Sequence, residues 1–179
     1  MCRNFAPQSV CPIWISEKNS GSFWMARYCF IIGMEPNHYP PLNIKCHFAA
    51  SAEKVFAAWT VPAIANLWLF KSRFNKVELI NDTTEGGMFS VKQWEDGIQS
   101  EGKMIDHFGK YIQVHNPSKL VFTLEVPDHF QGISKVTLHI STRNNGAVMN
   151  FMQEGIDTSI TKKPWKQMFK NLQRILNTL

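Results

Sequence analysis

A capped amphipathic helix, followed at once by a proline and a second short helix, is the feature that most constrains this chain. Ser51 is a favourable N-cap, and Glu53 places a negative charge in the first turn, where the helix dipole stabilises it. The next apolar residues recur at i, i+3, i+4 and i+7, which predicts one buried stripe of Ala52, Val55, Phe56 and Trp59. Pro62 ends this helix and begins the next, whose apolar residues are Ile64, Leu67 and Trp68.

Alternating apolar and polar residues predict one strand before these helices and several after them. The first strand has Leu42, Ile44, Cys46 and Phe48 on one face. A break is expected at His107–Lys110, and Asn144-Asn145-Gly146 is a strong hairpin signal. The predicted strands are residues 42–48, 74–80, 87–94, 98–106, 111–114, 120–126, 136–141 and 147–153.

A long helix is predicted to close the chain, from about Lys163 to Leu179, with Pro164 in its first turn. Its apolar face is wide and comprises Trp165, Met168, Phe169, Leu172, Ile175, Leu176 and Leu179. A face this broad needs a large surface to pack on, and a curved antiparallel sheet supplies one.

The charge of the chain is mildly basic, at +5 with an isoelectric point near 9.1. After Thr158 the charged residues are all basic, which fits a solvated helix face or contact with a phosphate or an acidic partner. The aromatic residues follow the inward phase of the strands, so no nucleic-acid-binding surface is predicted. The sequence contains neither a signal-peptide pattern nor an apolar run long enough to span a membrane, and a cytoplasmic location is predicted.

Motifs for metal binding and catalysis are absent from the sequence. Its 4 cysteines form no Cys-x-x-Cys pair, so neither zinc nor a redox dithiol is predicted, and Cys46 is expected to be a small buried hydrophobe. No cofactor-binding fingerprint and no catalytic constellation appears. His47 and His139 are expected to face outward, whereas His107 and His129 are expected in loops that could border a cavity mouth and serve in acid–base chemistry.

The N-terminal segment, residues 1–33, differs from the rest of the chain because it has no sustained period of either helix or strand. It is predicted to be an irregular extension, unless the true translation start lies at Met25 or Met34. Residues 34–179 are predicted to form a single domain.

The order strand, two helices, about six strands and a long helix resembles the helix-grip fold of the START and birch-pollen-allergen (Bet v-like, SRPBCC) superfamily, with a curved antiparallel sheet of about six to seven strands in all. Several motifs resemble landmarks of the activator-of-heat-shock-protein-90-ATPase-homologue family over roughly residues 42–179. One departure is Leu124-Glu125, where many relatives carry Trp-Glu. The motifs are Phe48-(x)2-Ser51-(x)3-Val55-Phe56-(x)2-Trp59, Leu67-Trp68-Leu69, Gly86-Gly87-Met88-Phe89, Gly109-Lys110-Tyr111, Leu120-Val121-Phe122-Thr123 and Trp165-(x)6-Leu172.

This resemblance implies an α+β fold in which a curved sheet grips the long helix, often with an apolar cavity between them. The predicted function is binding of a small apolar or aromatic molecule in that cavity, by a monomer or homodimer without catalytic residues, metal or cofactor. A chaperone-interaction module is the alternative, although residues 1–33 contain no counterpart of the namesakes' N-terminal domain, and a cyclase-type enzyme is a second alternative. The residues predicted to line the cavity are Trp68, Phe89, Trp94, Met104, Phe122, Phe130, Met149, Phe151, Trp165, Phe169 and Leu172.

Overall fold

One antiparallel sheet dominates this computed structural model, which describes residues 39–73, 75–95 and 103–178. Within these ranges the sheet has seven strands in the order β1-β7-β6-β5-β4-β3-β2. The strands are β1 (Leu42–Phe48), β2 (Asn75–Asn81), β3 (Met88–Glu95), β4 (Met104–His115), β5 (Lys119–Leu124), β6 (Ser134–Arg143) and β7 (Gly146–Glu154).

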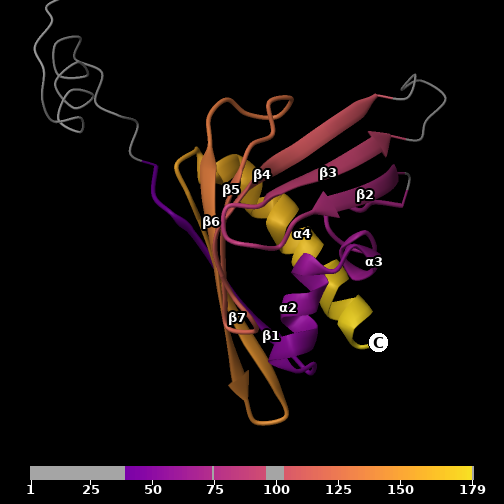
Figure 1. The fold of residues 1–179 in the computed structure, drawn as a ribbon, viewed down its shortest axis with the longest axis vertical. Helices are drawn as coiled ribbons and strands as arrows, with labels where there is room; N and C mark the ends of the chain where they lie inside the picture. The colour runs from indigo at the N-terminus through magenta and orange to yellow at the C-terminus, as the bar shows by residue number, and fades with distance from the viewer. Residues whose placement is uncertain (1–38, 74, 96–102, 179) are drawn as a thin grey trace, which may run out of the picture. The chain divides into compact units, whose positions relative to one another are not determined.

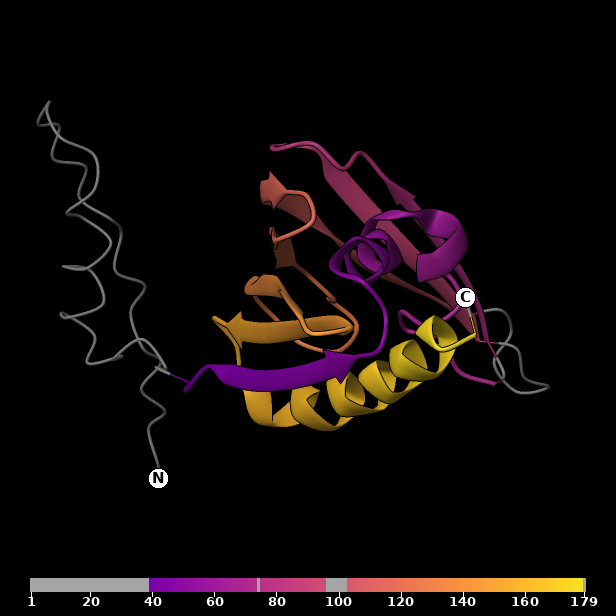
Figure 2. The same ribbon diagram turned by 90° about the horizontal axis from the view of Figure 1, so that it is seen from below.

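The sheet curls around the helices, which all lie on its concave side (Figures 1 and 2). Two short helices follow the first strand, and the long helix ends the chain. This is the α+β helix-grip architecture that the sequence predicts, and the prediction is confirmed. The helices are α2 (Ala52–Thr60), α3 (Pro62–Ala65) and α4 (Thr158–Leu176).

Helix α2 begins where the sequence predicts it. The Ser51 hydroxyl accepts a hydrogen bond from the backbone N–H of Lys54 at 3.4 Å, which satisfies one of the free donors of the first turn. The predicted stripe is buried in the concave side, together with Ala58. After α3 the chain turns, and the Trp68 indole N–H donates to the Ala58 carbonyl at 2.9 Å, which fastens this turn to α2.

Strand β4 runs continuously from Met104 to His115, so the predicted break at His107–Lys110 is wrong. Gly109 is what permits the continuous strand, because a Cβ at this position would lie 1.9 Å from the Thr123 carbonyl oxygen. The irregularity lies further on, as a bulge between Tyr111 and Gln113. His107 is therefore a strand residue on the inward phase. The predicted strand residues 98–102 lie outside the described residues.

Helix α4 begins at Thr158, several residues earlier than predicted. Asp157 is its N-cap, and the Asp157 carboxylate accepts a hydrogen bond from the Ser159 backbone N–H at 3.0 Å. Pro164 consequently lies inside the helix rather than in its first turn. The longer helix places Thr158 beside the segment that precedes β1, where the Thr158 hydroxyl donates to the Pro40 carbonyl at 2.9 Å.

Candidate functional site

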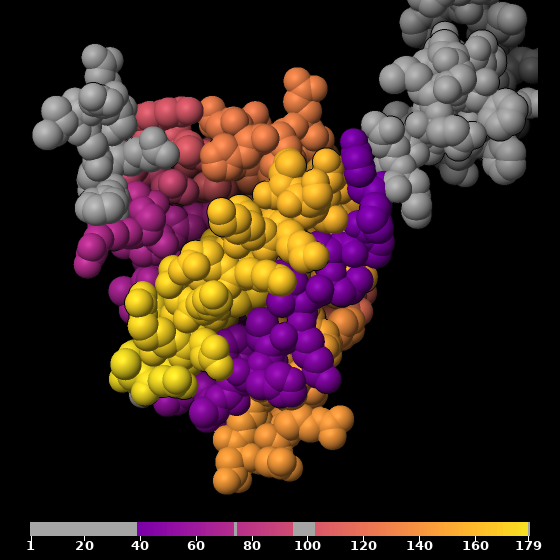
Figure 3. Space-filling view, turned by 180° about the vertical axis from the view of Figure 1, so that it is seen from behind, coloured from indigo at the N-terminus to yellow at the C-terminus, as the bar shows by residue number. Residues whose placement is uncertain are grey.

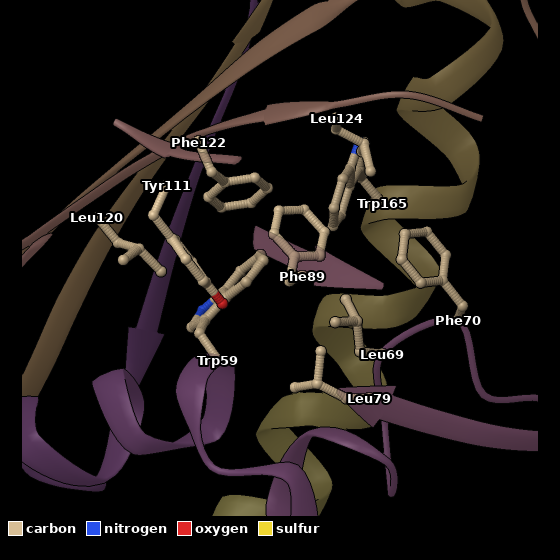
Figure 4. Close-up of a pocket in the computed structure, with 10 residues that line it drawn as sticks. All are labelled: Trp59, Leu69, Phe70, Leu79, Phe89, Tyr111, Leu120, Phe122, Leu124 and Trp165. Carbon is tan, nitrogen blue, oxygen red and sulfur yellow. The ribbon is translucent and has the colours of Figure 1, made fainter. Parts of the chain in front are cut away.

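Aromatic side chains fill the middle of the space between the sheet and α4. Trp59 lies at the centre, with its ring centroid 4.8 Å from that of Trp68 and 6.0 Å from that of Trp165. The void beside it measures about 20 Å³, which is little more than one water molecule requires. Figure 4 shows the side chains that converge on this void, namely Trp59, Leu69, Phe70, Leu79, Phe89, Tyr111, Leu120, Phe122, Leu124 and Trp165.

The residues predicted to line a cavity lie in several different places. Phe89, Phe122 and Trp165 border the small void. Phe130 borders a second, larger pocket, to which Trp165 also contributes. The others on the concave side are buried in the core, and they are Trp68, Met149, Phe151, Phe169 and Leu172.

Trp94 and Met104 lie on the opposite surface of the sheet, facing each other across the β3–β4 pair. Met104 is 44% exposed, and the Trp94 ring lies 5.2 Å from the Lys76 ammonium nitrogen. The strand phase explains this placement, because Val91 and Gln93 occupy the inward positions of β3. These two side chains therefore do not meet the other predicted residues.

The larger pocket has a volume of about 310 Å³ and lies between residues 160–171 of α4 and strands β3, β4, β5 and β7. We call it the His107 pocket. The loop after β5 and the turn after α3 complete its walls. Its lining residues are Phe70, Lys71, Gln93, His107, Leu124, Val126, His129, Phe130, Gln153, Ile160, Thr161, Pro164, Trp165, Gln167, Met168 and Asn171.

Phe70 reaches this pocket from a strained backbone conformation. Its φ angle is +51°, a left-handed value that non-glycine residues rarely adopt. Tertiary contacts hold it there, because its N–H donates to the Met168 sulfur at 3.2 Å and its carbonyl accepts from the Asn75 side-chain amide at 2.8 Å. Strain of this kind costs on the order of 1–3 kcal/mol and clusters at functional sites.

A buried amide organises the opposite wall of the pocket. Gln153 is fully buried, and its Oε1 accepts hydrogen bonds from the Thr161 hydroxyl at 2.7 Å and the Trp165 indole N–H at 2.9 Å. Its Nε2 donates to the Ser134 hydroxyl at 3.1 Å, and that hydroxyl donates to the Leu124 carbonyl at 3.0 Å. This network ties α4 to β5, β6 and β7 and fixes the orientation of the Trp165 indole.

His107 is the most distinctive group in the pocket wall. Its imidazole stacks on the Phe70 ring with centroids 3.7 Å apart and 14° between the planes, and it is only 2% exposed. Its Nε2 lies 3.2 Å from Gln93 Oε1, whereas its Nδ1 has no hydrogen-bond partner among the described residues. Burial, and secondarily the neighbouring His129, lower the pKa of His107 from 6.5 to about 3.

Acidification is therefore expected to destabilise the protein through His107. The folded pKa is about 3 and the ordinary value is 6.5, so between these values the unfolded chain binds a proton that the folded chain excludes. The free energy of unfolding then falls as the pH drops, by at most about 2 kcal/mol from this group at about pH 5. Urea titrations of the wild type and His107→Phe at about pH 7 and about pH 5 check this expectation. The variant should lose less stability, and equal losses in both proteins would contradict it.

The sequence contained only part of the signal for this pocket. His107 and His129 were expected near a cavity mouth, and both line the pocket, although His107 does so from a strand. Phe70, Gln93 and Gln153 were not singled out. The available signal for Gln93 and Gln153 was a polar side chain on the inward phase of a predicted strand, a position that usually implies a buried hydrogen-bond partner.

A basic groove of about 340 Å³ runs between β1 and α4. Figure 3 shows the two elements side by side, α4 in yellow and β1 in indigo. Lys45, His47, Lys166 and Lys170 line it, and the sequences of β1 and α4 contain no acidic residue. Cys46 also lines it, half-buried rather than fully buried as predicted, and burial raises the pKa of its thiol to about 11. The thiol is therefore protonated and weakly nucleophilic near neutral pH.

The described parts of the chain contain no group of three or more His, Cys, Asp or Glu side chains that could hold a metal ion. No helix in them has the length and apolar character needed to cross a membrane.

Solved structures of bacterial proteins share this fold. A Chromobacterium violaceum protein superposes with a TM-score of 0.66 at 20% identity, over 76% of this chain and 96% of its own. A Rhodobacter sphaeroides protein gives 0.66 at 22% identity, over 78% of this chain and 93% of its own. A Staphylococcus aureus protein gives a TM-score of 0.61 at 21% identity, over 78% of this chain and 94% of its own.

Comparison at the level of sequence agrees with the fold. No curated protein matches the chain significantly. A family model does match, over residues 49–179, which include every described element from α2 to α4. The chain therefore belongs to the family described as Activator of Hsp90 ATPase homolog 1-like protein, as its sequence motifs predict.

Proposed function

We propose that this protein binds a small, predominantly apolar or aromatic molecule in the His107 pocket. The observation that carries the proposal is a pocket of about 310 Å³ beside an otherwise filled core. Ligand pockets commonly measure about 300–1,000 Å³ and have apolar walls with a few fixed polar groups. Proteins with this fold commonly bind hydrophobic ligands or act as chaperone-associated modules, and the pocket favours the first of these activities.

The walls of the pocket match such a ligand. Phe70, Phe130 and Trp165 supply aromatic surface, and Leu124 and Val126 supply aliphatic surface. The polar groups are held in place, since Gln153 is fixed by its network and His107 by its stacking on Phe70. Preorganised walls lower the entropy cost of binding because few side chains must become ordered.

A ligand that binds here is expected to stabilise the folded protein. At a concentration a hundred times its dissociation constant the gain is about 2.7 kcal/mol, or roughly 5–10 °C in melting temperature for a chain of this size. Native mass spectrometry of the purified protein would detect a co-purified molecule. Thermal melts with fatty acids, sterols and flavonoid-like aromatics would find others, and Trp165 emission should change on binding. If no compound stabilises the protein and none co-purifies, the proposal fails.

A matched pair of variants localises the binding. Asn171→Trp places an indole at the pocket wall and should abolish the thermal shift by occupying the ligand's volume. Lys170→Trp adds the same indole at the adjacent residue of α4, which borders the basic groove instead. This control should retain the shift. If Lys170→Trp abolished the thermal shift and Asn171→Trp retained it, the ligand would bind in the basic groove and not in the pocket.

A second candidate function is interaction with an acidic segment of a chaperone. The observation in its favour is the basic groove formed by Lys45, His47, Lys166 and Lys170. Stimulation of the ATPase of a purified Hsp90-class chaperone would support it, provided that Lys166→Glu with Lys170→Glu removes the effect. Retained stimulation in this double variant would exclude the groove as the contact surface.

Acid–base catalysis of the cyclase type receives less support. The His107 and His129 rings meet edge to face with centroids 5.9 Å apart, so the pocket does contain a pair of neighbouring ionisable groups. However, a histidine whose pKa is lowered to about 3 is unprotonated near neutral pH and is a poor general acid. Binding is therefore the function that His107 supports best.

A further inference from the structure

His107 lines the pocket and has one buried ring nitrogen without a hydrogen-bond partner among the described residues. Buried polar atoms in proteins nearly always have partners, and leaving one without a partner is unfavourable. The Nδ1 atom of His107 is buried and has no partner in the described chain. Phe70 covers the face of the imidazole, whereas the Nδ1 hydrogen-bonding direction lies in the ring plane and is not blocked by the stacked phenyl.

The hydrogen-bond partner of Nε2 determines whether Nδ1 donates or accepts a hydrogen bond. Gln93 presents its carbonyl Oε1 to Nε2 at 3.2 Å. A carbonyl oxygen accepts hydrogen bonds and cannot donate one, so Nε2 carries the proton of the neutral imidazole. Nδ1 then has a lone pair, and its complement is an O–H or N–H donor.

The charges of the residues that line the pocket limit the charge that a ligand can have. Among the described residues that line the pocket none is acidic, so a cation has no counter-charge there. The ammonium of Lys71 donates to the Asn75 carbonyl. His107 itself stays neutral because burial lowers its pKa, so its surroundings disfavour a charged group. A cation is therefore disfavoured in the pocket, and the group that contacts His107 must be neutral, because an anionic oxygen has no hydrogen to donate to Nδ1.

We infer that His107 determines specificity by accepting a hydrogen bond at Nδ1, so that the pocket selects neutral aromatic ligands with a hydroxyl donor, that is, phenols. The inference rests on the proposed function of the pocket and names the chemical class of its ligand. The aromatic ring packs against Phe70 and Trp165, and the hydroxyl satisfies His107. An ether or hydrocarbon of the same shape fills the same volume but leaves Nδ1 without a donor.

Three probes of nearly equal shape test this preference, namely 2-naphthol, 2-methoxynaphthalene and naphthalene. Their dissociation constants for the full chain are measured by calorimetry or tryptophan fluorescence. The wild type should bind 2-naphthol about tenfold more tightly than 2-methoxynaphthalene, as expected for one additional buried hydrogen bond. His107→Phe keeps an aromatic ring in the wall but removes the acceptor, so the ratio should fall to near one while naphthalene still binds. His139→Phe, on the exposed surface of β6, is the control and should keep the ratio of the wild type.

The possible outcomes separate the two proposals. If none of the three probes binds the wild type while a fatty acid or sterol of the thermal screen does, the inference about His107 fails and the proposed function stands. If no compound of either set binds and none co-purifies, the proposed function fails. If they bind but 2-naphthol has no advantage, or if its advantage survives in His107→Phe, only the inference about His107 fails. Tighter binding of 2-methoxynaphthalene than of 2-naphthol would overturn the assignment of the lone pair to Nδ1. Should His107→Phe not fold, the 15N chemical shift of His107 Nδ1 decides, because 2-naphthol should shift it and naphthalene should not.

Discussion

Replacing Phe169 with alanine should lower the free energy of unfolding by about 3–5 kcal/mol, the usual cost of truncating a buried aromatic side chain. Phe169 is 4% exposed, and its ring packs against four aromatic neighbours, with centroids 5.1 Å from Phe151, 5.6 Å from Trp165, 6.2 Å from Trp59 and 6.4 Å from Trp68. A side chain that bordered an open cavity would cost much less. Urea denaturation of the variant therefore tests whether side chains fill the space between the sheet and α4.

Trp94→Ala is the matched control for this experiment. Trp94 is also a large aromatic residue predicted to line a cavity, but it lies on the outer surface, where its ring contacts Lys76. Its truncation should cost about 1 kcal/mol or less, because surface substitutions are usually mild. If Phe169→Ala cost as little as Trp94→Ala, the core around α4 would be loosely packed and the ligand site would extend into it.

Gln153→Leu is expected to be the second severe substitution. It removes the acceptor of the Trp165 indole N–H and the donor to Ser134, while the Thr161 hydroxyl still has the Thr158 carbonyl at 3.3 Å. The buried indole N–H is then left without a partner, and together with the other lost hydrogen bond this should cost about 2–4 kcal/mol. Chemical denaturation gives this value directly.

A double-mutant cycle separates the hydrogen bond from packing. In Trp165→Phe the indole N–H is absent, so Gln153→Leu in this background should cost at least about 1 kcal/mol less than in the wild type. Additive effects of the two substitutions would show that the contact between Gln153 Oε1 and Trp165 Nε1 contributes little to stability. Loss of ligand binding in Gln153→Leu, with the fold retained, would in addition identify Trp165 orientation as a requirement of the site.

Local patterns in the sequence predicted the fold because local physics produces its elements. The period of the apolar residues identified α2 and most of α4, and Asn144-Asn145-Gly146 identified the β6–β7 hairpin. In that hairpin Asn144 adopts a φ of +47°, and Arg143 pairs with Gly146. Asparagine tolerates this conformation, which is why the motif is a dependable signal.

The site was less predictable because tertiary contacts create it. Nothing in the residues next to Phe70 indicates a left-handed conformation that Met168 and Asn75 hold in place. Gln153 ended a correctly predicted strand, but its partners come from α4 and β6. Trp94 was expected to line the cavity because of its aromatic character, whereas the structure places Gln93, which contacts His107, on the concave side of β3.

The pairing of β1 with β7 has a consequence for how the chain acquires its structure. Leu42 pairs with Gln153 and Phe48 with Ala147, so the first strand of the sheet hydrogen-bonds to the last, and all the other strands together with α2 and α3 lie between them in the sequence. Contacts this distant in sequence slow folding, because the entropy of closing a long loop is lost before the contact forms. On the ribosome β1 has no strand partner until β7 has emerged. The nascent domain therefore exposes an unpaired strand edge through most of its synthesis, which is the stage at which it is most prone to aggregate.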